Sequence, residues 1–204
     1  GKFDHRLFPD EEVTEFEALV LRNSGNDNQS THQTPPRPPI TEFGPTLSYG
    51  SYFVNGQFTV MRDALLRQLV KGTTLDAQAY RPAVVYINGE YWGIYNIREK
   101  LNEHYVLSHH DAAAGSVDLI EGLGAVRAGT ATHYTQMRNY LSSRDLAADG
   151  AYDLVAERYL DIDNFIDYQL AVLYGGNFDI GNVKCWRPRA TRGRFRWLLY
   201  DQDY

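Results

Sequence analysis

The dipeptide Asn88-Gly89 limits the local fold more than any other feature of this sequence. It stands between two runs rich in β-branched and aromatic residues, over 83–87 and 90–97. Asn-Gly between apolar runs is the strongest short-range signal for a two-residue β-hairpin, because both residues tolerate the left-handed backbone of that turn. Large apolar side chains occupy both faces of both predicted strands. We therefore expect the rest of the protein to cover the hairpin on both sides.

Apolar periodicity predicts the elements on either side of this hairpin. Strands are expected over residues 15–23 and 117–120, and helices over 58–70 and 131–141. The first helix is expected to bury one apolar face, made of Met61, Leu65, Leu66 and Leu69. The stretch 26–56 is polar and rich in Pro and Gly, which is typical of a long surface loop.

Residues 151–174 are predicted to be helical, with a new helix beginning near Asn164. Asp161 or Asp163 is the candidate N-cap of this helix, and Gly175-Gly176 is its candidate stop. Its buried stripe is expected to comprise apolar residues at helical spacing: Ile162, Phe165, Ile166, Leu170 and Leu173.

A second hairpin is predicted at the end of the chain, with strands over 183–187 and 194–200 and a turn through 188–193. Two sheets of hairpins separated by helices define an α+β fold. The 204 residues suffice for one large domain or two lobes.

Charge and composition exclude several classes of function. The formal net charge of −6 argues against nucleic-acid binding, because phosphate contacts require a basic surface. No apolar run approaches the roughly 18 to 20 residues that cross a bilayer. The one cysteine, Cys185, rules out a disulfide framework and is expected to be a small core residue. Because the chain begins at Gly1 without a methionine and stops at Tyr204 directly after a predicted strand, we interpret it as a piece of a longer protein.

The chemistry of the chain is expected near its end, where the Asx-rich loop 177–182 precedes the second hairpin. The hairpin would return Asp201 and Asp203 beside this loop, because its strands begin and end together. Short oxygen side chains of this kind suit Mg²⁺ or Mn²⁺, which keep positions open for substrate phosphates. Protein kinases have the same order of catalytic Asp, metal-binding Asn, hairpin and metal-binding Asp. The pattern therefore favours phosphoryl transfer.

In this interpretation Asp179 orients or deprotonates the acceptor hydroxyl. Asn182, together with Asp201 or Asp203, would hold the metal ions that bridge the nucleotide phosphates. The alternative is that the Asx residues of the loop only form turns through local hydrogen bonds. That alternative is weaker for the two carboxylates, because Asp is poorly suited to a strand end without a partner.

Arg98 and Lys100, at the end of the first hairpin, are candidates for neutralising phosphates. From their spacing alone, an ordinary solvated strand end is the favoured interpretation of both residues. The sequence contains neither the G-x-x-x-x-G-K-[ST] loop nor the G-x-G-x-x-G loop that cradles phosphates in other nucleotide-binding proteins.

Several blocks resemble the CotH family of spore-coat-type atypical kinases, in the order of that family. They are LRNSGND at 21–27, RDAL at 62–65, RPAVVYINGEYWGIYNIREK at 81–100, DNFIDY at 163–168 and WLLYDQD at 197–203. The block over 81–100 is the most specific of them. The resemblance implies a divergent protein-kinase-like fold with an N-terminal lobe over about 1–110 and the start of a C-terminal lobe over about 111–204. The domain would continue beyond residue 204.

The resemblance also implies an activity: Mg²⁺- or Mn²⁺-dependent transfer of phosphate from ATP to Ser or Thr of a protein substrate, in a bacterial protein that is secreted, on the cell surface or in the spore coat. The catalytic Asp of the family would be Asp179, and its metal ligands would be Asn182 and either Asp201 or Asp203. Lys100, with Arg98, would contact the phosphates. The loop over 177–182 is shorter than the family pattern N-x-D-W-P-x-N-N and lacks its Trp-Pro pair. Two alternatives stay open: a non-catalytic surface-binding module, and a kinase for a small molecule or carbohydrate.

Overall fold

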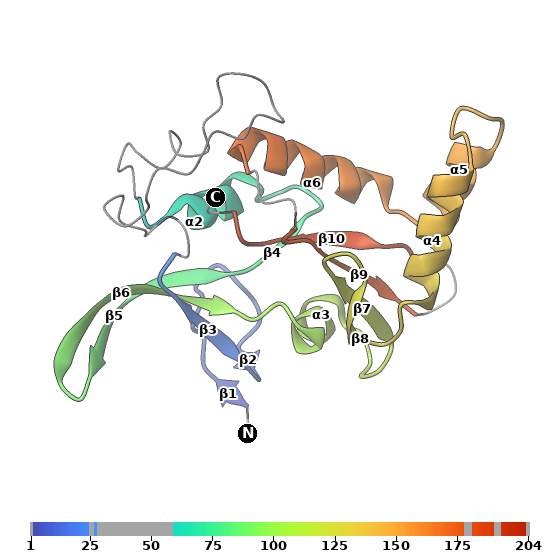
Figure 1. The fold of residues 1–204 in the computed structure, drawn as a ribbon. Helices are drawn as coiled ribbons and strands as arrows, with labels where there is room; N and C mark the ends of the chain where they lie inside the picture. The colour runs from blue at the N-terminus through green and yellow to red at the C-terminus, as the bar shows by residue number, and fades with distance from the viewer. Residues whose placement is uncertain (1, 25–26, 28–58, 178–180, 190–192, 203–204) are drawn as a thin grey trace, which may run out of the picture.

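The structure, a computed structural model, describes residues 2–24, 27, 59–177, 181–189 and 193–202, and this part of the chain is α+β (Figure 1). Its helices are α2 (Arg62–Leu69), α3 (Glu103–His110), α4 (Thr132–Ser143), α5 (Ala151–Arg158) and α6 (Ile162–Gly175). Its strands are β1 (Phe3–Asp4), β2 (Glu15–Phe16), β3 (Leu19–Arg22), β4 (Asp76–Ala77), β5 (Tyr80–Ile87), β6 (Glu90–Glu99), β7 (Val117–Glu121), β8 (Ala125–Ala128), β9 (Lys184–Pro188) and β10 (Arg196–Leu199). Within these residues, no helix combines the length and apolar character that a membrane span needs.

The described strands form three sheets rather than the two that the sequence predicts. One sheet has the order β3-β6-β5 and another the order β4-β10-β9-β7-β8, while β1 and β2 form a small sheet of their own. All pairings are antiparallel except that of β4 with β10. The extra sheet has strands of two residues each, which are too short to produce an apolar period in the sequence. The second predicted hairpin is confirmed as β9–β10.

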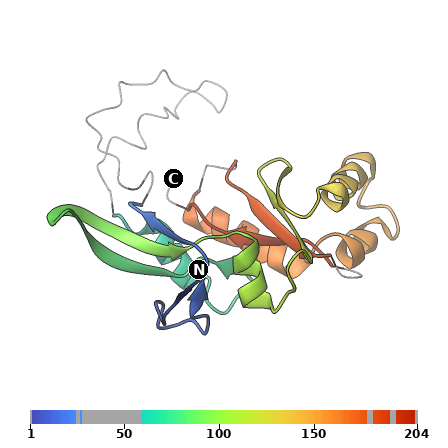
Figure 2. The same cartoon turned by 90° about the horizontal axis from the view of Figure 1, so that it is seen from below.

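The first predicted hairpin is confirmed as β5–β6. Asn88 and Gly89 both have positive φ, 53° and 85°, as the predicted two-residue turn requires. The prediction that both faces are covered is wrong, because the hairpin extends away from the rest of the described chain in both views (Figures 1 and 2). Large apolar side chains of both strands are exposed: Val84, Tyr86, Ile87, Tyr91, Trp92 and Ile94.

Of the two candidate N-caps of helix α6, the structure selects Asp161, whose carboxylate accepts a hydrogen bond from the Asn164 amide, and the helix begins at Ile162. The predicted buried stripe is only partly right. Ile162 and Phe165 are half-buried, but three of its members are exposed: Ile166, Leu170 and Leu173. The helix turns another face to β10, where the fully buried Asn164 accepts a hydrogen bond from the Trp197 amide at 2.6 Å.

Helix α2 begins at Arg62, later than the predicted residue 58. Of its predicted buried face only Leu66 lies in the interior, and the other three side chains are about half exposed: Met61, Leu65 and Leu69. The buried polar residue of this helix is Asp63, whose carboxylate accepts a hydrogen bond from the Gln202 amide near the end of the chain. The spacing of apolar residues therefore predicted the existence of this helix correctly, but it predicted the wrong buried face.

Two of the sheets meet at a very short joint between β4 and β5, which belong to different sheets. Only Gln78 and Ala79 separate these strands, and Ala79 is buried. The Ala79 amide donates to the Glu99 carboxylate at 3.0 Å, and the Glu99 amide donates to the Ala79 carbonyl at 3.3 Å. His109 of α3 lies 2.7 Å from the other oxygen of the same carboxylate. Glu99 therefore fixes the joint to the end of β6 and to α3.

Candidate functional site

Asp201 lies two residues beyond the end of β10 and contacts side chains from two other parts of the chain, strand β3 and the Asx loop. One carboxylate oxygen accepts a hydrogen bond from the guanidinium of Arg22 on β3, and the other accepts one from the side-chain amide of Asn182. The side-chain amide of Asn177 donates to the Asp201 backbone carbonyl at 3.2 Å. The structure thus brings the strand end and the described parts of the Asx loop together.

The backbone of Asp201 is itself unusual, because its φ of 59° lies in the left-handed region. A non-glycine residue there costs roughly 1 kcal/mol or more, and such residues gather at functional sites. The next residue is held firmly, since the Gln202 amide donates to the Asp63 carboxylate at 2.9 Å. Hydrogen bonds on both sides therefore offset the cost of this conformation.

A lysine, a glutamate and a tyrosine form a second group beside Asp201. Lys184, at the start of β9, lies 3.6 Å from a carboxylate oxygen of Glu121 at the end of β7, and 4.6 Å from the centre of the Tyr200 ring. The Tyr200 hydroxyl lies 3.4 Å from the same Glu121 oxygen. Burial lowers the pKa of the Lys184 ammonium, while the charges of Glu121 and Asp201 act in the opposite direction. Burial, and then the charges of Glu121 and Asp201, raise the pKa of Tyr200.

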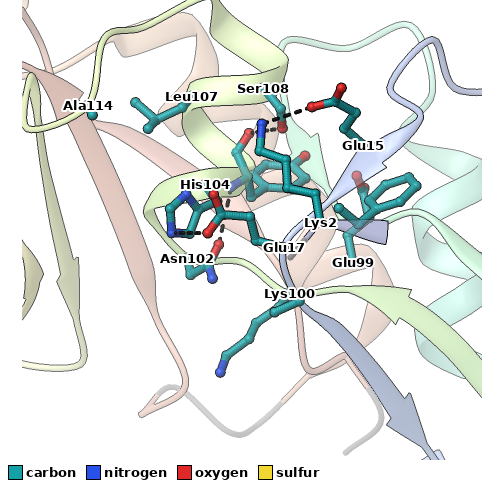
Figure 3. A pocket seen from close by; sticks show the side chains of 13 residues that line it. Lys2, Glu15, Glu17, Glu99, Lys100, Asn102, His104, Leu107, Ser108 and Ala114 are labelled. Carbon is teal, nitrogen blue, oxygen red and sulfur yellow. Dashed lines mark hydrogen bonds and ion pairs between the residues drawn. The ribbon is translucent and has the colours of Figure 1, made fainter. Parts of the chain in front are cut away.

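The two predicted phosphate-contacting residues lie in different environments. Arg98 is only 3% exposed and forms an ion pair with the buried Asp63, so its charge is balanced inside the protein. Lys100 is exposed and lines a pocket of about 310 Å³ between the β1–β2 sheet and α3. Figure 3 shows its amine at the edge of this pocket, pointing away from the paired Glu17 and His104. The geometry favours a structural role for Arg98 and leaves the role of Lys100 a prediction.

The predicted catalytic Asp179 and the predicted metal ligand Asp203 lie outside the described residues. Asn182 and Asp201 are described and in contact, and their roles as metal ligands stay predictions. In the described part of the chain, no three His, Cys, Asp or Glu residues gather closely enough to hold a metal ion alone. The Asp201 carboxylate and the Asn182 side chain fit Mg²⁺ or Mn²⁺, which are bound by one or two carboxylates and complete their shell with water and phosphate; to bind the cation, Asn182 would turn its amide oxygen toward it in place of the nitrogen that donates to Asp201.

Four residues around Asp201 were not identified as site residues from the sequence: Arg22, Asp63, Glu121 and Lys184. Arg22 and Asp63 lie in two blocks that carry the family resemblance, so the signal for them was present without an assigned role. Arg22 contacts a residue 179 positions away, and Asp63 contacts one 139 positions away. Spacing rules for helices and strands do not predict contacts of that range.

The comparison with protein families agrees with the resemblance carried by these blocks. The family described as CotH kinase protein matches residues 57–204, which is most of the chain and includes every residue of the site except Arg22. The chain therefore belongs to the CotH kinase protein family. No curated protein matches the chain.

Proposed function

We propose that this protein transfers the terminal phosphoryl group of ATP, with Mg²⁺ or Mn²⁺, to a Ser or Thr hydroxyl of a protein substrate. The observation that carries the proposal is the meeting of Asp201 with Asn182 and Asn177 at the end of β10. A carboxylate beside an asparagine side chain suits a cation that also binds phosphate oxygens, once the asparagine presents its amide oxygen. The family membership of residues 57–204 supports the same chemistry.

In this proposal five of the predicted site residues have defined tasks. Asp201 and Asn182 hold the cation, with Asp203 as the further candidate ligand, and Asp179 aligns the acceptor hydroxyl and accepts its proton. A bound divalent cation supplies positive charge to the phosphates during transfer. Lys100 contacts the phosphates from the end of β6. Catalysis of this type consists mostly of positioning and electrostatic stabilisation, which suits a site tied to several strands.

Asp179 provides the test of catalysis. We expect Asp179→Asn to abolish autophosphorylation with labelled ATP and Mn²⁺, because the aligning carboxylate is lost while the fold is kept. The matched control is Asp111→Asn, at an exposed acid at the end of α3. A variant at Asp179 that keeps most of the wild-type signal would remove this residue from the proposed mechanism.

A second candidate function is a non-catalytic binding module, secreted or on the cell surface. The exposed apolar side chains on the β5–β6 hairpin favour it, because contiguous apolar surface marks interaction sites. Thermal unfolding with ATP and Mn²⁺ separates the two functions. A nucleotide present at 100 times its Kd stabilises a protein by about 2.7 kcal/mol through mass action, whereas a binding module would give no shift.

The proposal also concerns the phosphoryl acceptor and the cellular location of the protein. The same site would also allow transfer to a small molecule or a carbohydrate, so labelled ATP should be offered with protein and with carbohydrate acceptors in parallel. Labelling of the protein acceptor alone supports the proposal. We further propose, from family membership, that the protein acts outside the cell or in a spore coat. Fractionation of cells that express the whole protein tests that location.

A further inference from the structure

Arg22 links two sheets through a single side chain. Its backbone belongs to the β3-β6-β5 sheet, where Arg22 pairs with Asn96. Its guanidinium contacts Asp201, which lies two residues after β10. Strand β10 belongs to the sheet of order β4-β10-β9-β7-β8. The side chains of both partners are partly buried, with 22% of Arg22 and 20% of Asp201 exposed. Arg22 also precedes the residues that match the family, which begin at residue 57.

The contact places a positive charge on the carboxylate that the proposed function assigns to a cation. One oxygen of Asp201 accepts from Arg22 and the other from Asn182. A divalent cation on this carboxylate would lie within a few ångströms of the guanidinium. At such a short separation the guanidinium and the cation repel each other strongly, because water screens charges less in a partly buried site than in bulk solution. The ion pair with Arg22 and a cation on Asp201 are therefore competing states.

The guanidinium has a second kind of partner available once a cation is bound. A nucleotide brings phosphate oxygens to the cation, and the planar fork of an arginine matches phosphate geometry with two parallel hydrogen bonds. The β3–β6 ladder fixes the Arg22 backbone, so only the long side chain has to move. Arg98, the neighbouring arginine on β6, is much less suited to this exchange, because it is 3% exposed and paired with Asp63, which also holds the Gln202 amide.

We propose that Arg22 is an exchangeable counter-ion of the site. It neutralises Asp201 when no divalent cation is present, and it binds the phosphates of the nucleotide when Asp201 holds the cation. This inference rests on the proposed phosphoryl-transfer function. It adds a phosphate-binding residue from β3 and makes cation binding and nucleotide binding mutually dependent.

Two binding measurements on the 204-residue chain test this exchange without any assay of catalysis. The first is Mn²⁺ affinity in the absence of nucleotide, measured by electron paramagnetic resonance of free Mn²⁺. The second is ATP affinity at saturating Mn²⁺, measured by calorimetry. For Arg22→Met we expect Mn²⁺ alone to bind about tenfold more tightly, and ATP about tenfold more weakly. Hydrogen bonds to charged groups are typically worth a factor of this size.

The opposite signs of the two changes distinguish this role from a structural one. If Arg22 only holds Asp201 in place, its loss weakens both affinities together, and that result overturns the inference. Changes of less than twofold in both affinities also overturn it. Arg22→Gln removes the charge but keeps an amide donor on a shorter side chain, and we expect it to give the same pattern. If circular dichroism shows that Arg22→Met is unfolded, the affinities of Arg22→Gln decide whether Arg22 exchanges partners.

Arg67→Met is the matched control. Arg67 forms an ion pair with Glu11 of similar burial, with 10% and 22% of the two side chains exposed, and it lies outside the candidate site. We expect it to leave both affinities unchanged. If the wild-type chain binds neither Mn²⁺ nor ATP, the proposed function fails and this inference fails with it. If the wild type binds both and the Arg22 variants match it, only this inference fails.

Discussion

The ion pair between Asp63 and Arg98 offers the most direct test of what holds the site together. Asp63 lies in the first turn of α2, and its carboxylate pairs with the Arg98 guanidinium while also accepting the Gln202 amide. Both side chains are buried, 6% and 3% exposed. We predict that Asp63→Ala strongly destabilises the protein, because it leaves a buried charge and a buried amide without an acceptor.

The magnitude follows from these two losses. Removing one partner of a buried ion pair costs about 3–5 kcal/mol, and a buried donor left unsatisfied costs about 1–3 kcal/mol. The two costs overlap, because both concern one carboxylate, so we expect a total of about 3–5 kcal/mol. That is a large share of the roughly 5–15 kcal/mol that stabilises a typical domain. Asp63→Asn keeps an oxygen for Gln202, and we expect a smaller loss of roughly 2–3 kcal/mol.

Urea unfolding at pH 7, followed by tryptophan fluorescence and circular dichroism, measures these changes. The double variant Asp63→Ala/Arg98→Met removes both charges, so we expect it to be no less stable than Asp63→Ala alone. Asp10→Ala is the control, because Asp10 forms an exposed ion pair with Lys71 and its loss should change the midpoint little. A cost below 1 kcal/mol for Asp63→Ala, or strictly additive costs in the double variant, would refute this account of the pair.

Three further predictions concern single residues of the interior. Burial raises the pKa of the Cys185 thiol to about 12, so iodoacetamide at pH 8 should modify this thiol only after unfolding. The contribution of the neutral thiol to stability is complete below its ordinary pKa of 9.0 and is lost as the pH rises toward 12. Above pH 9 the thermal midpoint should therefore fall less in Cys185→Ala than in the wild type. Gly129→Ala should cost about 1–3 kcal/mol in urea unfolding, clearly more than Gly115→Ala, because both glycines have positive φ but only at Gly129 would the new Cβ meet neighbouring atoms, including the Asp118 carboxylate. Asn164→Leu should cost about 1–3 kcal/mol by the same measurement, since it leaves a strand amide of β10 without its acceptor, and a stability equal to wild type would contradict the hydrogen-bond account.

The sequence predicts best those features that depend on residues close together along the chain, such as turns and helix caps. The β5–β6 hairpin and its turn were predicted correctly because Asn88-Gly89 alone specifies the reversal of the chain. The N-cap of α6 was narrowed to Asp161 or Asp163 for the same reason, since an N-cap and the amide that donates to it are three residues apart, as Asp161 and Asn164 are.

The side of an element that faces the interior was predicted less well. Leu170 and Leu173 of α6 are exposed, while Asn164 and Ala171 lie inside, because this helix has apolar residues on more than one face. A period of 3.6 residues indicates a helix without showing which face its neighbours cover. The exposed β5–β6 hairpin has the same explanation, because apolar side chains on two faces of a strand do not specify what covers them.

The candidate site was predicted in part. The return of Asp201 toward the Asx loop follows from hairpin geometry, and the structure places Asn182 in contact with it. Arg22 and Asp63 were missed as members of the site because they meet the end of the chain only after the sheets have assembled. Such contacts depend on the packing of whole elements, and no local spacing encodes them.

The joint between β4 and β5 has a consequence for the speed of events at Asp201. Arg22 pairs with Asn96, three residues before the Glu99 that clamps the joint, and Asp201 lies two residues beyond Leu199, which pairs with Ala77 of β4. Both backbones are therefore anchored within a few residues of one rigid connection. Separating them would require the hydrogen bonds of Ala79 to break first. A change of partner at Asp201 should accordingly proceed by rotation of side chains, without a microsecond-to-millisecond hinge motion.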